Sequence, residues 1–421
     1  MERGLQMGDS GRPWDVIVVG ARVAGSTLAA YLGKAGLRTL LIDRVRFPAY
    51  VPRQGSWELP TRQRWTDLGV MPLIDAVGAP ARRGYYSAVG DAVLTYRFPV
   101  GDPAAYNVMV RRITLDDILA RFAGSLPTVE FRTGHAATGL LWDDDRVVGV
   151  RTMEDGRTYQ EHAHVVVGAD GRHSWTARQV NAPEYERIRS PKANFIADYA
   201  DTNLDPDMSV RCWDHVGSMG MLMMEDQLVT IGMGVPLTEL PAFRAGLPNT
   251  FEQRLRRHRL YREQLGDGRR VSPIGGAVDL AMFKRKPFGP GWALVGDAGY
   301  HLDPLAARGT TAAVTSADLL AQAIIGSIGG QQPEAAAFAA YQAARDAALA
   351  ADWDVTYGAI MRPQPTTRDL CEAQILQARP DFVAQHIEVM RGLRDATEFR
   401  RMLDTEIEGR MAEDARLTAP S

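Results

Sequence analysis

The segment from residue 15 to residue 44 constrains the fold of this chain more than any other, because it predicts a strand, a glycine turn, a helix and a second strand in immediate succession. The short apolar run Val16–Val19 is typical of a buried parallel strand, and Gly20 ends it. Small and apolar residues then recur at helical spacing, and the next apolar run closes with Asp43. N–H groups at a helix N-terminus bind a pyrophosphate, and an acid after the second strand accepts hydrogen bonds from a ribose. The segment therefore predicts a dinucleotide-binding unit.

The glycine pattern of this turn departs from the usual one at a single position. The pattern G-x-G-x-x-G would place glycine at position 22, where this chain has Arg22. Asp43 follows the turn at about the expected separation of roughly 20 residues. A packed unit without a ligand would explain the glycines but would leave the acid without a role. We therefore expect a cofactor to be bound through Gly20, Arg22, Val23, Ala24, Gly25 and Asp43.

Composition narrows the function classes further. The chain has 421 residues, 24% of them charged, and a net charge of −3, which gives no electrostatic case for binding nucleic acid or a membrane surface. Cys212 and Cys371 are far apart in the sequence and show no metal-ligand spacing, which is typical of a reducing compartment. Residues 1–13 contain no apolar core of a signal peptide, and no run reaches the about 18 apolar residues of a membrane span. We expect a cytoplasmic protein with a small-molecule substrate, no metal and no protein partner.

The order of strand patterns along the chain predicts an α/β fold with an insertion. Buried strands of the parallel type are expected at the start of the chain, near 165–167 and near 292–295, whereas 190–280 alternates short strands with loops. We expect a Rossmann-like cofactor domain with an inserted antiparallel-sheet substrate domain and C-terminal helices. The expected parts are a flexible tail at 1–13, the cofactor domain at 14–80, 102–185 and 281–330, the substrate domain at 81–101 and 186–280, and a helical region at 331–421.

Turn and cap residues predict some local elements. A hairpin is expected around Gly90-Asp91. Thr114 is the expected N-cap of a helix over 114–124. The polar alternation of 157–163 and the apolar run of 165–167 predict two separate strands.

Two further motifs add to the dinucleotide-binding unit. Residues 165–174 read VVVGADGRHS, and residues 292–309 read WALVGDAGYHLDPLAARG. Together with the first unit, they resemble the glutathione-reductase-type FAD fold of single-component flavoprotein monooxygenases, and equally the related geranylgeranyl-reductase-like oxidoreductases. The resemblance covers about residues 14–325 and implies FAD as the cofactor and NAD(P)H as a co-substrate.

The resemblance assigns roles to particular residues. Asp297 would hold the ribityl chain of FAD, Pro304 would lie near the isoalloxazine ring, and Gly309 would open a helix facing the flavin pyrimidine edge. Arg112 would contact the FAD phosphates or ribityl chain, with Arg111 as the alternative. The segment containing Gly168, Asp170 and Gly171 matches a motif with a dual role near FAD and NAD(P)H. The remaining expected cofactor contacts are Arg44, Arg53, Ala137, Gly296 and Thr310.

The third motif departs from the hydroxylase pattern in ways that weaken any transfer of substrate class. Tyr300 stands where many hydroxylases have histidine, and His301 is next to it. Ala307 and Arg308 replace the common Gly-Gln, which resembles the reductase-like branch more closely. Tyr300, His301 and Pro304 are the candidates for shaping the reaction site, although flavin reactivity and positioning can suffice without a catalytic acid or base.

The candidate substrate contacts are less specific. Methionine is dense between residues 208 and 233, which suits an adaptable apolar pocket and equally an ordinary core. Trp57 can flank the flavin ring or serve as a buried anchor, and a lone histidine such as His215 is more often structural. The expected substrate contacts are Trp57, His215, Met221 and Met223.

The favoured function is an FAD-dependent monooxygenase, a hydroxylase or epoxidase, in natural product biosynthesis. The resemblance implies that NAD(P)H and dioxygen generate a flavin C4a-hydroperoxide, which attacks an apolar aromatic ring or alkene in a dry cavity. The alternative is a reductase or dehydrogenase acting on a C=C bond. A flavin halogenase is disfavoured because no lysine lies between Lys34 and Lys192, where the lysine of such halogenases would be expected. A flavin-bound scaffold without activity is the remaining alternative.

Overall fold

The computed structural model describes residues 6–7, 12–51, 54–57, 59–99, 107–214, 217–362, 364–391 and 393–418. The chain divides into two compact units. Unit 1 comprises Met1–Gly78, Val110–Ser190 and Asp279–Gly358, and unit 2 comprises Ala79–Met109, Pro191–Val278 and Ala359–Ser421.

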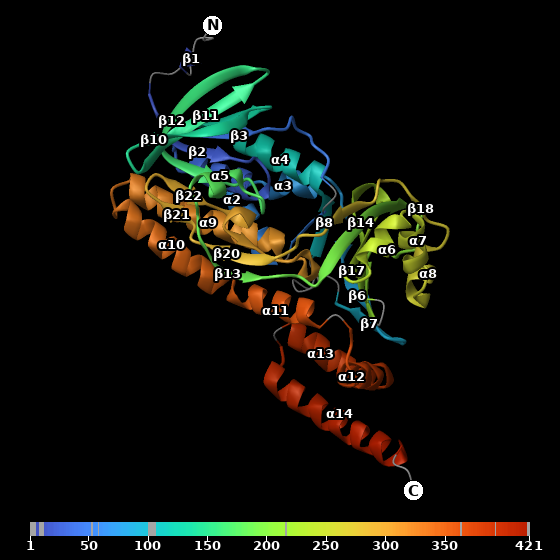
Figure 1. Cartoon of the computed structure of the whole chain (residues 1–421). Coiled ribbons are helices and arrows are strands. Elements are labelled where there is room, and N and C mark those ends of the chain that lie inside the picture. Colours follow the sequence, from blue (N-terminus) through green and yellow to red (C-terminus); the bar gives the residue numbers. More distant parts are fainter. Residues whose placement is uncertain are drawn as a thin grey trace. The chain divides into compact units, whose positions relative to one another are not determined.

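Unit 1 is built on a parallel sheet. Its strands are β2 (Trp14–Val19), β3 (Thr39–Asp43), β9 (Val129–Thr133), β12 (Arg157–Gly168) and β22 (Trp292–Leu294). They lie in the order β22–β12–β2–β3–β9, and every neighbouring pair is parallel. Figure 1 labels four of them, β2, β3, β12 and β22, in the upper part of the view. The apolar runs of these strands are buried, as expected for a sheet covered on both faces.

An antiparallel meander extends this sheet. β10 (Ala136–Asp143) and β11 (Arg146–Glu154) pair with each other, and β11 pairs with the first half of β12. The prediction of separate strands at 157–163 and 165–167 is therefore wrong. One strand of 12 residues pairs first with the meander and then with the parallel strands. β1 (Gln6–Met7) pairs with β12, and β21 (Phe288–Gly289) pairs with β22.

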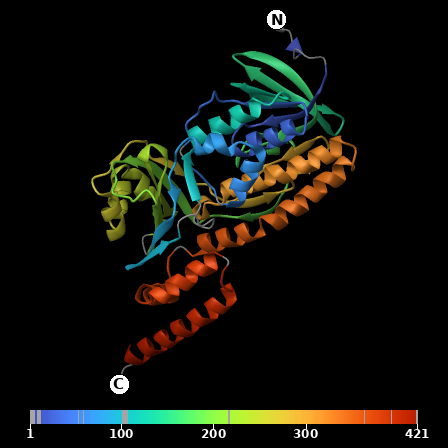
Figure 2. The same cartoon turned by 180° about the vertical axis from the view of Figure 1, so that it is seen from behind.

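Helices pack on the sheet of unit 1. α1 (Val23–Lys34) contacts both α4 (Arg112–Gly124) and α9 (Gly309–Ile328), and α9 contacts α10 (Glu334–Ala348). Figures 1 and 2 show α9 and α10, in orange, side by side. Smaller elements complete the unit: α2 (Leu59–Leu68), α3 (Met71–Asp75), α5 (Trp175–Gln179), β4 (Gln54–Trp57) and a small sheet of β13 (Glu184–Ile188), β20 (Met282–Arg285) and β23 (Tyr300–His301).

Two helices of unit 1 bear on the expectations from the sequence: α4, through its first residue, and α9, through its apolar length. α4 begins at Arg112 with Arg111 as its N-cap residue, so the predicted cap Thr114 is wrong. α9 is, among the described helices, the one long and apolar enough by length and composition to cross a membrane, but 61% of its apolar window is buried inside the protein. Such burial is typical of a core helix, and α9 contacts both α1 and α10.

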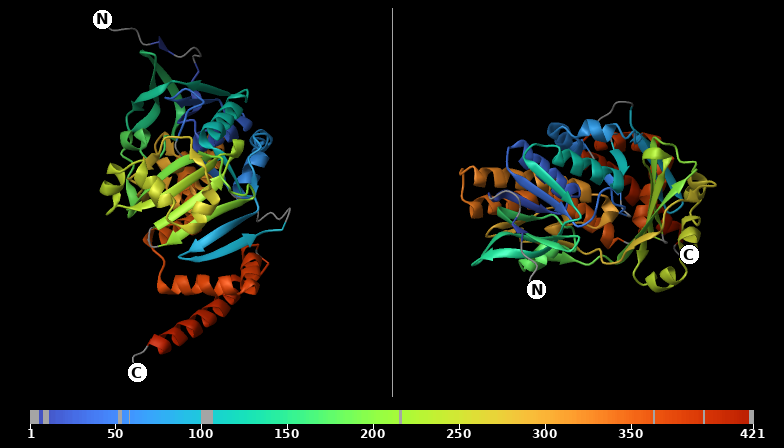
Figure 3. Two further views of the ribbon diagram at one scale, coloured as in Figure 1. Left: turned by 90° about the vertical axis from the view of Figure 1, so that its right-hand side faces the viewer. Right: turned by 90° about the horizontal axis from the view of Figure 1, so that it is seen from above.

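Unit 2 contains a mostly antiparallel sheet that the β6–β7 hairpin extends through a parallel pairing of β6 with β15, as the left view of Figure 3 shows. Its main strands, in spatial order, are β14 (Lys192–Ala200), β17 (Val229–Pro236), β16 (Gly217–Met223), β15 (Met208–Asp214), β6 (Gly84–Val89) and β7 (Ala92–Arg97). The hairpin predicted around Gly90-Asp91 is confirmed. Short strands β18 (Arg269–Arg270) and β19 (Gly275–Ala277) pair with β14, and two further short strands are β5 (Ala81–Arg82) and β8 (Asn107–Arg111).

Two groups of helices pack on this sheet, and each group forms its own apolar cluster with it. One face packs on α6 (Leu240–Ala245), α7 (Asn249–Leu255) and α8 (Arg259–Leu265). The hairpin strand β7 packs instead on α12 (Thr367–Ala378), α13 (Pro380–Met390) and α14 (Ala396–Thr418). α11 (Ala350–Met361) carries the chain from unit 1 into unit 2. The predicted α/β class, with a parallel-sheet domain, an antiparallel sheet and C-terminal helices, is confirmed.

Candidate functional site

The three sequence motifs meet at one edge of the parallel sheet of unit 1. The carboxyl ends of parallel strands lie at the same edge, which is where such sheets bind ligands. Backbone hydrogen bonds align the three loops there: Gly20 N–H donates to Ile42 O over 2.8 Å, and Ala169 N–H donates to Val19 O over 2.8 Å. Val295 N–H donates to Gly168 O over 3.0 Å. Segments far apart in the sequence are thus held in a fixed register.

Glycine is required where these loops touch. Gly20 has a φ of +109°, and a Cβ there would lie 2.5 Å from Ala169 O. A Cβ at Gly25 would lie 1.8 Å from Gly20 O, inside the carbonyl oxygen. A Cβ at Gly296 would lie 2.7 Å from the Cβ of Ala24. The absence of these side chains forms a backbone cradle of the kind that a pyrophosphate needs.

Asp43 lies where the second strand ends, as the dinucleotide-binding pattern predicts. Its two carboxylate oxygens accept hydrogen bonds from Ala21 N–H at 2.9 Å and Val45 N–H at 3.0 Å. The residue is 8% exposed. A carboxylate has about four acceptor sites, so Asp43 retains capacity for ribose hydroxyls while it fixes the glycine turn.

The loop after β22 presents a second acid. From position 291 to position 303, Asp297 is the single residue that is not fully buried. Gly296 has a φ of +60°, and its N–H donates to Ser316 Oγ over 3.1 Å. The loop is therefore rigidly held and leaves Asp297 as its accessible group, which fits the predicted contact with a ribityl chain.

The N-terminus of α9 is open. Pro304 and Ala307 are exposed, and Gly309 and Thr310 are partly exposed. Among the described residues, no atom lies within 4 Å of a Cβ built on Gly309, so the backbone can be approached closely on that side. The backbone N–H groups at a helix N-terminus carry positive partial charge. The position suits the negatively charged edge of a reduced flavin.

Of the remaining predicted contacts, Arg44 and Ala137 lie close to Asp43 in the chain or in the fold, whereas Arg53 and the side chain of Trp57 are not described. Arg44 is exposed directly after the acid. Ala137 lies in β10, two residues after His135, whose N–H donates to Asp43 O over 2.9 Å. Arg53 lies outside the described residues, and Trp57 ends β4 with a side chain that the structure does not describe.

Arg112 has an internal partner. Its guanidinium donates to both carboxylate oxygens of Asp116, at 2.9 and 3.0 Å. Asp116 is 2% exposed, and burial raises its pKa while Arg112 opposes this effect. The pair fixes the direction of the guanidinium, but the predicted flavin contact of Arg112, or of the alternative Arg111, remains a prediction.

The carboxylate of Asp170 accepts hydrogen bonds from residues that follow it closely in the chain. One carboxylate oxygen accepts a hydrogen bond from Ser174 Oγ, and the other accepts from Thr176 N–H at 2.8 Å and Thr176 Oγ1 at 3.1 Å. Ser174 in turn caps α5. Gly171 has a φ of +81° with open space around it. The side chain of Asp170 therefore shapes the loop, and Gly171 is the position where a ligand can approach the backbone.

Tyr300 and His301 do not present reactive groups. Tyr300 is 1% exposed, and its hydroxyl donates to Leu349 O over 3.1 Å. His301 is 3% exposed, its Nδ1 lies 2.8 Å from Ala281 O, and its ring stacks on Phe283. Burial raises the pKa of Tyr300. Both side chains are therefore buried, and their predicted part in shaping the reaction site stays a prediction, whereas Pro304 is the exposed candidate.

The predicted substrate methionines belong to the core of unit 2. Met221 is 0% exposed and Met223 is 9% exposed, and both pack among residues of α6–α8. Strand residues alternate between faces, so the other face of β16 carries Ser218 and Gly220. The expected substrate contacts of Met221 and Met223 therefore stay a prediction, and the small residues that alternate with them lie on the opposite face. His215 lies outside the described residues.

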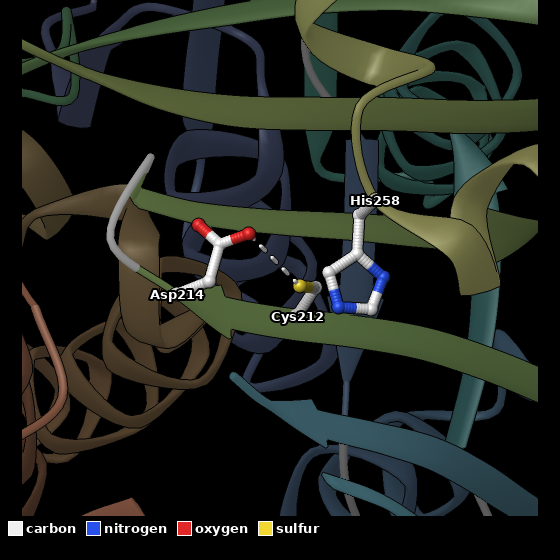
Figure 4. Close-up of side chains that lie close together, drawn as sticks. All are labelled: Cys212, Asp214 and His258. Carbon is white, nitrogen blue, oxygen red and sulfur yellow. Dashed lines mark hydrogen bonds between the residues drawn. The ribbon is translucent and has the colours of Figure 1, made fainter. Parts of the chain in front are cut away.

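A polar cluster in unit 2 was missed, because His258 is distant in the sequence from Cys212 and Asp214. Potential ligand atoms of Cys212, Asp214 and His258 lie within 4.8 Å of one another (Figure 4). These residue types bind zinc. However, His258 Nδ1 accepts from Leu260 N–H at 3.2 Å, and Nε2 lies 3.1 Å from Gly90 O, so hydrogen bonds already occupy both ring nitrogens.

The thiol of Cys212 is also disfavoured as a metal ligand, because its protonated form is stabilised. Burial, followed by the nearby Asp214, raises the pKa of Cys212, which disfavours the thiolate that binds metals. The imidazole of His258 caps α8 and ties it to the β6–β7 turn. The cluster therefore acts as a structural hydrogen-bonded group.

Known proteins resemble this chain in sequence and in structure. A probable NADH-specific resorcinol 4-hydroxylase of Rhodococcus jostii is 32% identical over 164 residues, which cover 37% of this chain and 30% of that protein. A digeranylgeranylglycerophospholipid reductase of Methanocella arvoryzae is 26% identical, covering 82% of this chain and 86% of the reductase.

Among solved structures, a myxobacterial chondrochloren halogenase superposes with a TM-score of 0.76, covering 94% of this chain and 97% of the halogenase at 22% identity, which shows a shared fold. The model of a family described as "FAD binding domain" matches residues 13–354. That match includes all three loops at the carboxyl edge of the sheet. The chain therefore belongs to this family of FAD-binding oxidoreductases.

Proposed function

We propose that this protein is an FAD-dependent monooxygenase that uses NAD(P)H and dioxygen to hydroxylate or epoxidise a small molecule with an aromatic ring or alkene. The observation that carries the proposal is the convergence of Asp43, the glycine cradle, Asp297 and the open α9 N-terminus on one sheet edge of unit 1. An elongated dinucleotide flavin needs all four features.

Each feature has a separate task. Asp43 would bind the adenosine ribose, the cradle of Gly20 and Gly25 would admit the pyrophosphate, and Asp297 would hold the ribityl chain. The α9 N-terminus would donate N–H groups to the pyrimidine edge and stabilise negative charge there. When bound, FAD would supply the redox chemistry by carrying two electrons from NAD(P)H to dioxygen.

The substrate contacts are better sought on the sheet face of unit 2 that lies opposite α6–α8. Gly220 and Gly232 are paired on this face, and a Cβ on either would meet no atom closer than 3.7 Å. Such a face admits a flat ring. Nearby on the same face, the Ser218 hydroxyl is buried without a hydrogen-bond partner among the described residues, so a polar substituent on the ring would satisfy it.

A reductase acting on a C=C bond is the second candidate. Ala307 and Arg308 resemble the reductase-like branch, and the similarity to the reductase of Methanocella arvoryzae spans 82% of this chain. Halogenation is supported by similarity to known halogenases in both fold and sequence, but the positions of the lysines disfavour it. Lys34 is the one lysine before Lys192, and its Nζ lies at the surface, 3.5 Å from Asp67 O at the far end of α1.

Stopped-flow spectroscopy with isotope labelling tests the three candidates together. The FAD-loaded protein would be reduced anaerobically with NADH or NADPH, in the presence of a panel of phenols, indoles and prenyl alkenes, and then mixed with ¹⁸O₂ with and without bromide. Incorporation of one ¹⁸O atom into a product supports the monooxygenase.

The other outcomes are distinct. A product that gains two hydrogens without oxygen uptake would identify a reductase, and a product formed only with bromide would identify a halogenase. Failure of both nicotinamide cofactors to reduce the bound flavin, with any of these compounds, would contradict all three.

A further inference from the structure

One face of α10 holds the backbone on both sides of the Gly296-Asp297 loop. Tyr341 and Arg345 are one helical turn apart, and Leu349, the C-cap residue, follows at the same spacing. Tyr341 OH donates to Leu294 O over 2.9 Å, before the loop. Leu349 O accepts from the hydroxyl of Tyr300 at 3.1 Å, after the loop.

Arg345 lies between these two contacts and reaches the loop itself. Its Nη1 donates to Gly299 O over 3.3 Å, and a Cβ on Gly299 would lie 3.0 Å from the same nitrogen. Its Nη2 also donates to Tyr185 OH at 2.8 Å and to Arg285 O at 3.2 Å. The guanidinium thus joins α10, β13 and β20 to the end of the loop.

Arg345 is buried to an unusual degree for a cation. It is 0% exposed, and Asp346 is its ion-pair partner, with Oδ1 accepting at 2.8 and 3.0 Å. Burying a charge costs several kcal/mol unless hydrogen bonds compensate it, and apolar replacements of buried ion pairs are often no less stable. Stability of the fold alone therefore gives little reason to place arginine here.

The consequence for the loop is a fixed backbone. Arg285 Nη1 donates to Ala298 O at 3.0 Å, beside the Arg345 bond to Gly299 O, and Ser316 accepts the Gly296 N–H. With these groups tied back into the protein, Asp297 is left as the partly exposed residue of the loop. A ligand-holding side chain is precise only if its supporting residues are locked.

The geometry points to Arg345 as a positioning residue for the flavin. It fixes the Gly296–Gly299 turn so that Asp297 can hold the ribityl chain, and it makes no contact with the cofactor itself. This inference rests on the proposed binding of FAD. It predicts that loss of Arg345 weakens only the part of the cofactor that lies at this loop.

Two ligands separate the two halves of the cofactor site. FAD occupies both the Asp43 end and the Asp297 loop, whereas ADP occupies the Asp43 end alone. The dissociation constants of both would be measured by calorimetry on the flavin-free, full-length chain, for the wild type, Arg345→Met and Arg345→Lys. Methionine keeps the length of the side chain without a buried charge, and lysine keeps the charge without the planar fork.

Arg146→Gln is the matched control. Arg146 pins the other end of α10, through Glu334 at 2.7 and 3.0 Å, and touches no residue of the Gly296–Gly299 turn. We expect Arg345→Met to weaken FAD binding at least about tenfold, equivalent to about 1.4 kcal/mol, with ADP binding within about twofold of wild type. Arg345→Lys should show a smaller selective loss, and the control should leave both dissociation constants unchanged.

Other results would overturn the inference. Equal losses for FAD and ADP, or no loss for either, in the variants of Arg345 would assign the residue to folding alone. ADP binding reports a folded cofactor domain, and Arg345→Lys decides the matter if the methionine variant does not fold. If the wild type binds ADP but not FAD, the proposed function fails instead.

Discussion

Asp43 lies at the end of one buried strand of the parallel sheet and Asp297 just after another, but they were expected on different grounds: the spacing after the glycine turn predicts Asp43, whereas the family resemblance implies Asp297. A strand, a turn and an acid are contiguous in the sequence, so their relation in space follows from local rules. Asp43 lies where expected, with Ala21 N–H and Val45 N–H as its donors. The positions of Gly20 and Gly25 were predictable on the same basis.

Tyr300 and His301 could not be placed in this way, since distant segments determine their burial. The hydroxyl of Tyr300 is bonded to Leu349 O, and the imidazole of His301 lies against Ala281 O. Both partners belong to other elements of the chain. Met221 is a similar case, because the choice of sheet face depends on where α6–α8 pack.

Asp297→Ala tests the residue-scale account. Loss of a carboxylate that accepts hydrogen bonds from the cofactor should cost roughly 1.5–3 kcal/mol of binding, so the variant should purify largely colourless. The measurement is the ratio of flavin to protein absorbance after purification. Asp318→Asn removes a partly buried ion pair between Asp318 of α9 and Arg64 of α2, and this variant should retain the yellow cofactor. A fully yellow Asp297→Ala protein would show that the loop does not hold FAD.

The sequence predicted the order of strands and helices around the parallel sheet better than it predicted where each strand begins and ends. β2, α1 and β3 follow the predicted order, but the polar start and apolar end of β12 suggested two strands where the structure has one. The exposed His164 interrupts the apolar run although the backbone continues. The periodicity of a strand changes when its neighbours change from β11 to β2 and β22, and the sequence does not reveal the neighbours.

The turn between β2 and α1 gives an element-scale prediction. Gly25→Ala would place a methyl group 1.8 Å from Gly20 O, so the turn must open, at a cost of roughly 3 kcal/mol or more. Gly409→Ala, in the exposed face of α14 with no atom within 4 Å of the new Cβ, should instead stabilise by about 1 kcal/mol. Urea denaturation followed by circular dichroism measures both. Equal effects of the two substitutions would contradict the close approach at Gly25.

At the scale of the whole molecule, the chain passes repeatedly between two units. The part of the cofactor domain expected at 102–185 overlaps the segment Val110–Ser190 of unit 1. The part of the substrate domain expected at 186–280 overlaps the segment Pro191–Val278 of unit 2. The C-terminal helical region was expected as one part, and the units divide it after Gly358. Helical periodicity predicts the helices of this region but not the sheet on which each packs.

The helices of unit 2 should make its stability sensitive to acid. Burial, then Arg211 and Arg400, lower the pKa of His386, which lies 3.3 Å from Tyr96 OH and stacks on Phe399. The unfolded chain therefore binds a proton more readily than the folded one, and the free energy of unfolding should fall as the pH drops below about 6.5. At neutral pH both states are uncharged at this residue, so the effect vanishes.

Urea denaturation at pH 7.5 and pH 5.5 measures this dependence, and His386→Gln supplies the comparison. The wild type should lose more stability on acidification than the variant. An identical pH dependence of the two proteins would show that His386 is not responsible.

The proposed function requires that one sheet edge of unit 1 holds an extended FAD molecule. A crystal structure of the full chain with FAD tests it most directly. We expect the adenosine ribose at Asp43, the pyrophosphate over Gly20 and Gly25, the ribityl chain at Asp297 and the isoalloxazine beside Pro304 and the N-terminus of α9. An isoalloxazine bound away from Pro304, or an adenosine away from Asp43, would contradict it.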